Sequence, residues 1–177
     1  MARTGFWRAP VVVFTIAAIA PGAAAAPRAD TNVQVAGRIL SYLQPPVSGS
    51  VSAAIIYQPG DAASENEARS IERALGTGLV VGSLRLQPRR VPVNALDRLA
   101  GAKVAFVTRG TDYRAVAAAT APRSILTISS DPACTRAGYC VVTISSAPRL
   151  QIIVSKAATR AARLRFNTSF LMLNKEI

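Results

Sequence analysis

Hydrophobic residues follow two patterns along the chain, one typical of amphipathic helices and one typical of buried strands. The first helical pattern runs from Asp30 to Leu43, where apolar residues recur three and four positions apart. Short, continuous apolar runs then occupy residues 51–57, 79–86, 103–108 and 124–129, and turn-forming residues bound each of them. Helical patterns separate these runs at residues 64–75, 94–99 and 112–120. The sequence therefore predicts strands that alternate with helices.

The start of the second predicted helix has a recognisable signature. Ser64 is followed three residues later by Glu67, which predicts a capping box with Ser64 as the N-cap. Gly76 is expected to end this helix. Glu65, Glu67 and Glu72 are expected to lie on its solvated face rather than to act as an acid–base pair.

The C-terminal third predicts a hairpin and a closing helix. Apolar runs at residues 140–145 and 150–155 flank a short proline-containing turn, as in an antiparallel hairpin. Residues 156–173 are expected to form one helix, with Phe166, Phe170 and Leu173 on a single face. That face could dock on the sheet or contact a second copy of the chain.

These elements together predict an α/β fold in a single domain over residues 26–177. Strands that alternate with helices require crossover connections, which give a mostly parallel sheet with helices on both faces. The hairpin would add antiparallel strands at one edge.

The first 25 residues indicate export. Arg3 and Arg8 precede an apolar run of about ten residues, and Pro21-Gly22 and four alanines follow it. A membrane span needs roughly 20 apolar residues. We therefore predict a cleaved signal peptide over residues 1–25, an uncleaved anchor being the alternative, and a periplasmic location with no transmembrane span in the mature chain.

The composition narrows the function. The formal net charge is +12, and removal of Arg3 and Arg8 with the signal lowers it by two. The basic residues are scattered and the chain is expected to be exported, so we predict no nucleic-acid partner; either the charge is simply solvated or it attracts an anionic partner. The sequence has no histidine, which excludes Ser-His-Asp and Cys-His arrangements. We expect a non-enzyme with no catalytic residues, metal or cofactor.

Cys134 and Cys140 are the only cysteines and lie six positions apart. Two cysteines in an exported chain most often pair, and Gly138 would let so short a loop close. A redox-active pair is the alternative, although such pairs usually have Cys-x-x-Cys spacing. Tyr139 lies inside this loop beside Arg136, and we expect it to be either a core aromatic or an anchor for a protein partner.

The order of these segments resembles the YfiR-like family of bacterial periplasmic proteins over roughly residues 33–177. The resemblance rests on the first helix with its Pro45-Pro46 break, the strand at 125–130, the cysteine pair, the strand at 150–154, and the ending that begins Leu164-Arg165-Phe166. The chain departs from the family in two places. Gln44 precedes the prolines where the family has an aromatic pair, and Leu150 and Gln151 replace a phenylalanine and an acidic residue in the late strand.

The resemblance implies a regulator. Such proteins repress an inner-membrane diguanylate cyclase by binding its periplasmic sensor region, which lowers cyclic di-GMP and restrains biofilm formation. They often form homodimers and can depend on oxidised cysteines. The residues expected to contact a partner are Arg136, Tyr139, Gln151, Phe166 and Phe170.

A small-ligand binding module of the periplasm is the alternative function. Residues 53–78 are similar to part of one lobe of a transporter-linked binding protein, and ligands of such sheets bind at the carboxyl ends of the strands.

Overall fold

The computed structural model describes residues 28–146 and 149–177, so the predicted signal peptide lies outside the described residues. The strands are β1 (Gly49–Tyr57), β2 (Leu79–Val81), β3 (Leu84–Pro92), β4 (Ala102–Val107), β5 (Leu126–Ser129), β6 (Val142–Ser145), β7 (Gln151–Val154) and β8 (Lys175–Glu176). The helices are α1 (Arg28–Ser41), α2 (Ala62–Leu75), α3 (Tyr113–Thr120), α4 (Pro132–Arg136), α5 (Lys156–Ala161) and α6 (Thr168–Leu173), with 3-10 turns η1 (Val93–Leu99) and η2 (Ala121–Arg123).

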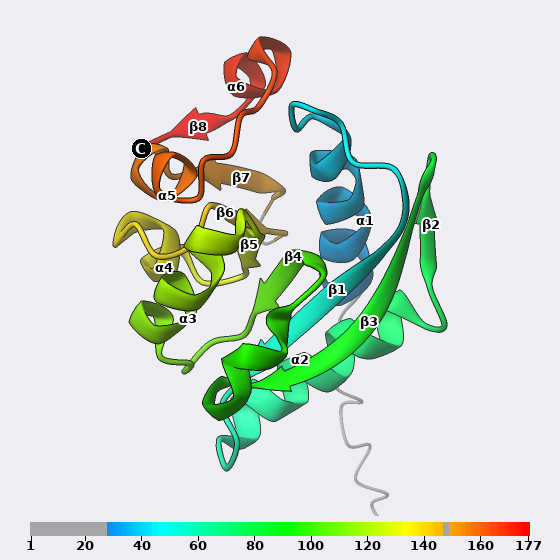
Figure 1. Ribbon diagram of the computed structural model, residues 1–177, viewed down its shortest axis with the longest axis vertical. Coiled ribbons are helices and arrows are strands. Elements are labelled where there is room, and N and C mark those ends of the chain that lie inside the picture. The colour runs from blue at the N-terminus through cyan, green and yellow to red at the C-terminus, as the bar shows by residue number, and fades with distance from the viewer. Residues whose placement is uncertain (1–27, 147–148) are drawn as a thin grey trace, which may run out of the picture.

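The strands form one sheet in the order β2-β3-β1-β4-β5-β6-β7-β8 (Figure 1). The central strands β3, β1, β4, β5 and β6 are parallel, and β6 and β7 form the expected antiparallel hairpin. After β1 the chain adds β3 on one side of it and then crosses to β4 on the other. The winding direction therefore reverses between β1 and β4, a position at which α/β sheets commonly bind ligands. The predicted α/β class is confirmed.

Helices cover both faces of the sheet, and each face has its own core. On one face, α1 and α2 pack against Ile55, Phe106 and Ile144, and α5 and α6 extend this core. On the other face, η1, α3 and α4 pack against Ile56 and Val107. Alternation of side chains along each strand sends neighbouring residues to opposite cores. No helix in the described ranges is long and apolar enough to cross a membrane.

The strand predicted at 79–86 is wrong in detail, because the structure has two strands there. Gly82 adopts a φ of +58° and turns the chain, so that β2 pairs antiparallel with β3. The sheet thus has an antiparallel edge at this end as well as at the hairpin.

The closing helix predicted over 156–173 is also wrong in detail. The helix ends after Ala161, and Arg163 has a φ of +54°. The connecting segment instead pairs with the end of α1, where Gln44 N–H donates to the Arg165 carbonyl at 2.8 Å. A second short helix, α6, then leads into β8, which pairs parallel with β7.

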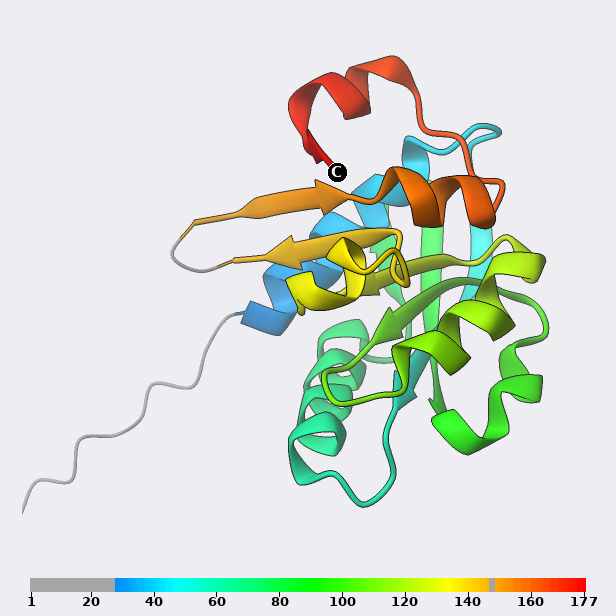
Figure 2. The same ribbon diagram turned by 90° about the vertical axis from the view of Figure 1, so that its left-hand side faces the viewer.

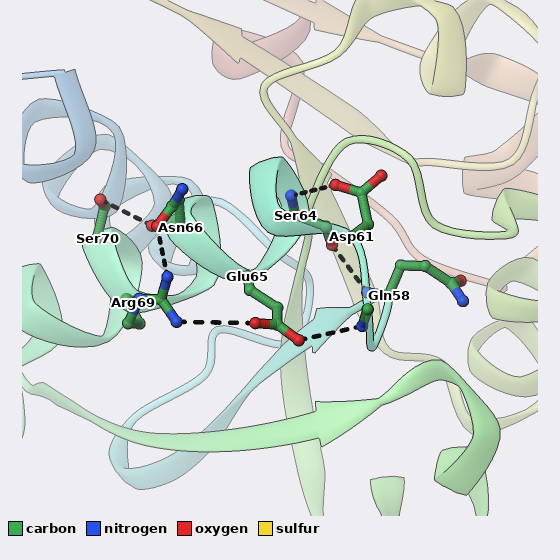
Figure 3. A network of polar contacts seen from close by, with 8 residues as sticks. Gln58, Asp61, Ser64, Glu65, Asn66, Arg69 and Ser70 are labelled. Atoms are coloured by element: carbon green, nitrogen blue, oxygen red, sulfur yellow. Dashed lines mark hydrogen bonds and ion pairs between the residues drawn. The ribbon is translucent and has the colours of Figure 1, made fainter.

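The predicted capping box of α2 does not form. Asp61 is the N-cap, and its Oδ1 accepts from the Ser64 N–H at 2.9 Å (Figure 3). Ser64 therefore lies in the first turn, where its buried hydroxyl accepts from the Gln58 N–H at 2.8 Å and lies 2.6 Å from the Thr108 hydroxyl. This bond ties the start of α2 to the end of β4. Glu67 therefore does not cap α2, and its carboxylate instead accepts from residues that follow β4 and β5.

Candidate functional site

The predicted disulfide is present and closes a short loop after β5. Cys134 lies on α4 and Cys140 lies two residues before β6, with Cα atoms 5.2 Å apart and both side chains fully buried. The Cys134 carbonyl accepts from the N–H groups of Tyr139 and Cys140, at 3.0 and 3.2 Å. Gly138 turns the chain with a φ of +76°, as the loop requires. The burial of both sulfurs suits a structural bond.

Other contacts fix the loop from the side of the sheet. Asp131 caps α4, its Oδ1 accepting from the Ala133 N–H, while its Oδ2 accepts from the Tyr113 hydroxyl at 2.8 Å. Burial first, and then this bond to Asp131, raise the pKa of Tyr113 well above its usual value. The buried hydroxyls of Thr135 and Thr143 lie 2.6 Å apart and join α4 to β6. The loop is therefore held as a rigid platform.

Arg136 and Tyr139 lie on this platform, together with an arginine from another element. Arg136 is exposed, and Tyr139 is half-buried and packs against the core on the face that α3 and α4 cover. The exposed guanidinium of Arg114 on α3 lies beside the Tyr139 side chain, and its interaction with that side chain raises the pKa of Arg114 above its usual range. We call Arg114, Arg136 and Tyr139 the stapled-loop surface. No sequence pattern pointed to Arg114, because it lies beside Tyr139 only in the folded chain.

The other predicted contact residues lie elsewhere. Gln151 is exposed at the start of β7, opposite Ser145. Phe166 and Phe170 are only 7% and 3% exposed and belong to the core under α1. The Phe170 ring packs against Phe166 at 4.8 Å and against Tyr42 at 5.3 Å between centroids. The structure thus brings Arg136 together with Tyr139 but does not join them to the two phenylalanines.

Exposed apolar side chains follow Phe170 on α6. Met172 and Leu173 are 82% and 81% exposed, so Leu173 does not share the buried face that the sequence pattern gives it. A dimer contact through α6 stays a prediction, and these two side chains would carry it.

A cavity of about 460 Å³ opens at the carboxyl ends of β4, β5 and β6, between α1 and α2. Figure 2 shows these three strands pointing the same way, toward the beginning of α1. The cavity is lined by apolar side chains of the sheet and of both helices, and by polar groups that include Glu67, Arg109 and Ser130. Ligands of α/β sheets bind outside the carboxyl ends of the strands, and this cavity lies at such an edge, beside the reversal between β1 and β4.

The cavity corrects the expectation for Glu67, which is not simply a solvated surface residue. Its Oε2 accepts from the Arg109 N–H at 2.9 Å, and its Oε1 accepts from the Ser130 hydroxyl. The Arg109 Nε–H donates to the same hydroxyl at 3.3 Å. The sequence carried a signal for this site, because Arg109 and Ser130 each come just after a buried strand. No cluster of three potential metal ligands occurs among residues 28–146 and 149–177.

One family profile matches most of the chain. The profile of the DUF4154 family, described as YfiR/HmsC-like, matches residues 33–175. The chain belongs to this family. Membership of this family supports a regulatory role rather than a catalytic one. It also supports a periplasmic location. A comparison with proteins of curated function found no match.

Solved structures show the same fold at very low identity. This YfiR/HmsC-like protein aligns with a conserved domain protein from Vibrio cholerae, with a TM-score of 0.62 at 10% identity. It also aligns with an ABC domain in complex with L-Trp from Streptococcus pneumoniae (0.58, 10%) and with an open, ligand-free substrate-binding protein with adhesive properties from Clostridium difficile (0.60, 8%). Each alignment covers 84% of this chain but only 59% of the other. The YfiR/HmsC-like chain therefore shares a fold with part of these proteins.

Proposed function

We propose that this YfiR/HmsC-like protein is a periplasmic repressor of an inner-membrane diguanylate cyclase, which it holds inactive by binding the cyclase's periplasmic sensor region. Membership of the family supports this class of function. The stapled-loop surface is the feature of this chain that best suits partner recognition, because it presents a rigid aromatic and two cations.

The chemistry of that surface favours a protein partner. Tyrosine and arginine are enriched among the residues that contribute most to protein interfaces. Tyr139 is half-buried and lies in a loop closed by the disulfide, so binding would cost little side-chain entropy. Arg114 and Arg136 would complement an acidic patch on the sensor region, and would also speed association.

Repression follows from differential affinity. A cyclase that exchanges between active and inactive states shifts toward the state whose sensor region this protein binds more tightly. To move that equilibrium from mostly active to mostly inactive requires a preference of roughly 10⁴-fold between the two states. The disulfide would serve this preference by fixing the shape of the surface.

Cyclic di-GMP in cells that lack the gene tests this proposal. Reintroduction of the wild-type chain should lower cyclic di-GMP, as measured by mass spectrometry of cell extracts. A chain with Arg136→Glu and Tyr139→Ala should fail to lower it, because the change removes the aromatic anchor and reverses one charge.

A matched control separates the surface from a general effect of charge. Arg85→Glu with Val80→Ala makes a similar change on exposed residues of the β2–β3 edge, where Val80 is 56% exposed. This control should repress as the wild type does. Full repression by the Arg136 and Tyr139 variant, at normal abundance and melting temperature, would remove the stapled-loop surface from the interface.

A further inference from the structure

We propose that the cavity at the carboxyl ends of β4, β5 and β6 binds a small monocarboxylate ligand that has an apolar body. This site goes beyond the proposed repression, because it involves none of the stapled-loop residues and lies under α1 and α2 rather than under α3. The inference rests on the shape of the cavity, on the free terminal nitrogens of Arg109, and on the capped N-termini of the helices that follow the strands.

The interior of the cavity suits an apolar group. The sheet contributes Phe106, Ile128 and Ile144, and the helices contribute Val33 and Ile71. A volume of about 460 Å³ falls within the range of small-molecule sites, roughly 300–1,000 Å³. A ligand with an aromatic or branched aliphatic body would bury apolar surface of its own against these side chains.

Arg109 supplies the anion-binding group at the mouth. Its backbone N–H donates to Glu67, and its Nε–H donates to Ser130, so the residue is held at two points. Its two terminal nitrogens, Nη1 and Nη2, have no hydrogen bond to any residue in the described part of the chain. A guanidinium whose terminal nitrogens are free presents a planar pair of donors that matches a carboxylate.

Glu67 does not compete for that pair of donors. One of its oxygens accepts from the Arg109 backbone and the other accepts from Ser130, and no ion pair joins its carboxylate to the Arg109 guanidinium among the described residues. Glu67 thus orients Ser130 and the Arg109 backbone, while the guanidinium remains available to a ligand.

The capped helices that follow β1, β4 and β5 favour a monoanion over a phosphate. Phosphates commonly bind the free N–H groups at helix N-termini. Here Asp61, Asp112 and Asp131 cap α2, α3 and α4 with their own carboxylates, at 2.9, 3.1 and 2.9 Å from the capped nitrogens. None of these aspartates lines the cavity, and their caps occupy helix N-terminal donors that a phosphate would otherwise use. One guanidinium beside an apolar cavity is the arrangement expected for a single carboxylate.

Two probes that differ only in charge test the site. The purified protein, in the form the cell accumulates, is titrated calorimetrically with 3-phenylpropionate and with its neutral amide. We expect saturable binding of the carboxylate and at least tenfold weaker binding of the amide. Arg109→Gln should weaken binding of the carboxylate at least tenfold and leave the amide unchanged. Arg89→Gln is the control, because Arg89 is an exposed arginine outside the cavity that donates to the Ala100 carbonyl.

A blocking variant locates the binding in the cavity. Ala63 lines the cavity yet is exposed on α2, so Ala63→Phe can fill the entrance without disturbing the core. It should abolish binding at an unchanged melting temperature. Three results would each overturn the proposal: no saturable binding of 3-phenylpropionate up to about 10 mM, equal affinity for acid and amide, or binding that survives Ala63→Phe. None of these results bears on repression of a cyclase, which is read from cyclic di-GMP.

Discussion

Reduction of the Cys134–Cys140 disulfide should lower the free energy of unfolding by about 2 kcal/mol. The bond spans a sequence separation of six residues. The loss of loop-closure entropy in the unfolded chain for a loop of this length corresponds to roughly 2.2 kcal/mol at 25 °C. For a domain of this size, each kcal/mol shifts the melting temperature by roughly 2–4 °C, so reduction should lower it by roughly 4–9 °C.

Equilibrium urea unfolding with and without reductant measures this difference. Both sulfurs are fully buried, so samples must be incubated in urea until the reductant has reached them through the unfolded state. Cys134→Ala with Cys140→Ala is the control, and its unfolding curve should be the same in both conditions. If oxidised and reduced wild type differed by less than about 0.5 kcal/mol, the loop would be held by its hydrogen bonds alone and the entropic argument would be wrong.

Three further predictions concern the stability of the fold. Phe170→Ala should cost about 3 kcal/mol in urea unfolding, because it removes a ring that is 3% exposed from between two others, whereas Met172→Ala should change stability by less than about 0.5 kcal/mol. Asp61→Ala should cost about 1 kcal/mol, because α2 loses its N-cap, and far-ultraviolet circular dichroism should show whether the helix shortens. The pKa of Tyr113 is raised in the folded protein, so its contribution to stability is complete below the usual value of 10.0 and is lost as the pH rises above it. The free energy of unfolding, measured between pH 8 and 11, should therefore fall above pH 10, and this fall should be smaller in Tyr113→Phe.

Much of the fold follows from the spacing of apolar residues. The runs that become β1, β4 and β5 are short, continuous and bounded by turn residues, which is the pattern of strands buried on both faces. The run at 79–86 has the same pattern, but Gly82 turns the chain in its middle, and a single glycine is equally compatible with a continuous strand.

The local sequence pattern does not predict the structure of residues 156–173 correctly. Residues 156–173 contain no proline or glycine, and their alanines favour a helix. The segment leaves the helix because its backbone pairs with residues 42–44, a contact between parts of the chain that are far apart in sequence. Helix propensity is only a weak predictor, and in this segment tertiary contacts override it.

Some features of the candidate sites could be predicted from the sequence, and others depend on tertiary contacts. The cysteine pair could be predicted because it depends on a short loop and on the expected export of the chain. The capping box could not be rejected from sequence, because Asp61 and Ser64 are both good N-cap residues and only the packing of Ser64 against Thr108 decides between them. Phe166 and Phe170 are buried within the chain, and their contact with a partner stays a prediction.

Identification of the membrane partner is the most direct test of repression by binding to a cyclase. The tagged protein should be crosslinked in intact cells and captured from the envelope, with and without reductant, and its partners identified by mass spectrometry. We expect recovery of an inner-membrane protein that carries a diguanylate cyclase domain, and weaker recovery after reduction of the disulfide. Recovery of no such protein in either condition, at normal abundance of the bait, would contradict repression by direct binding.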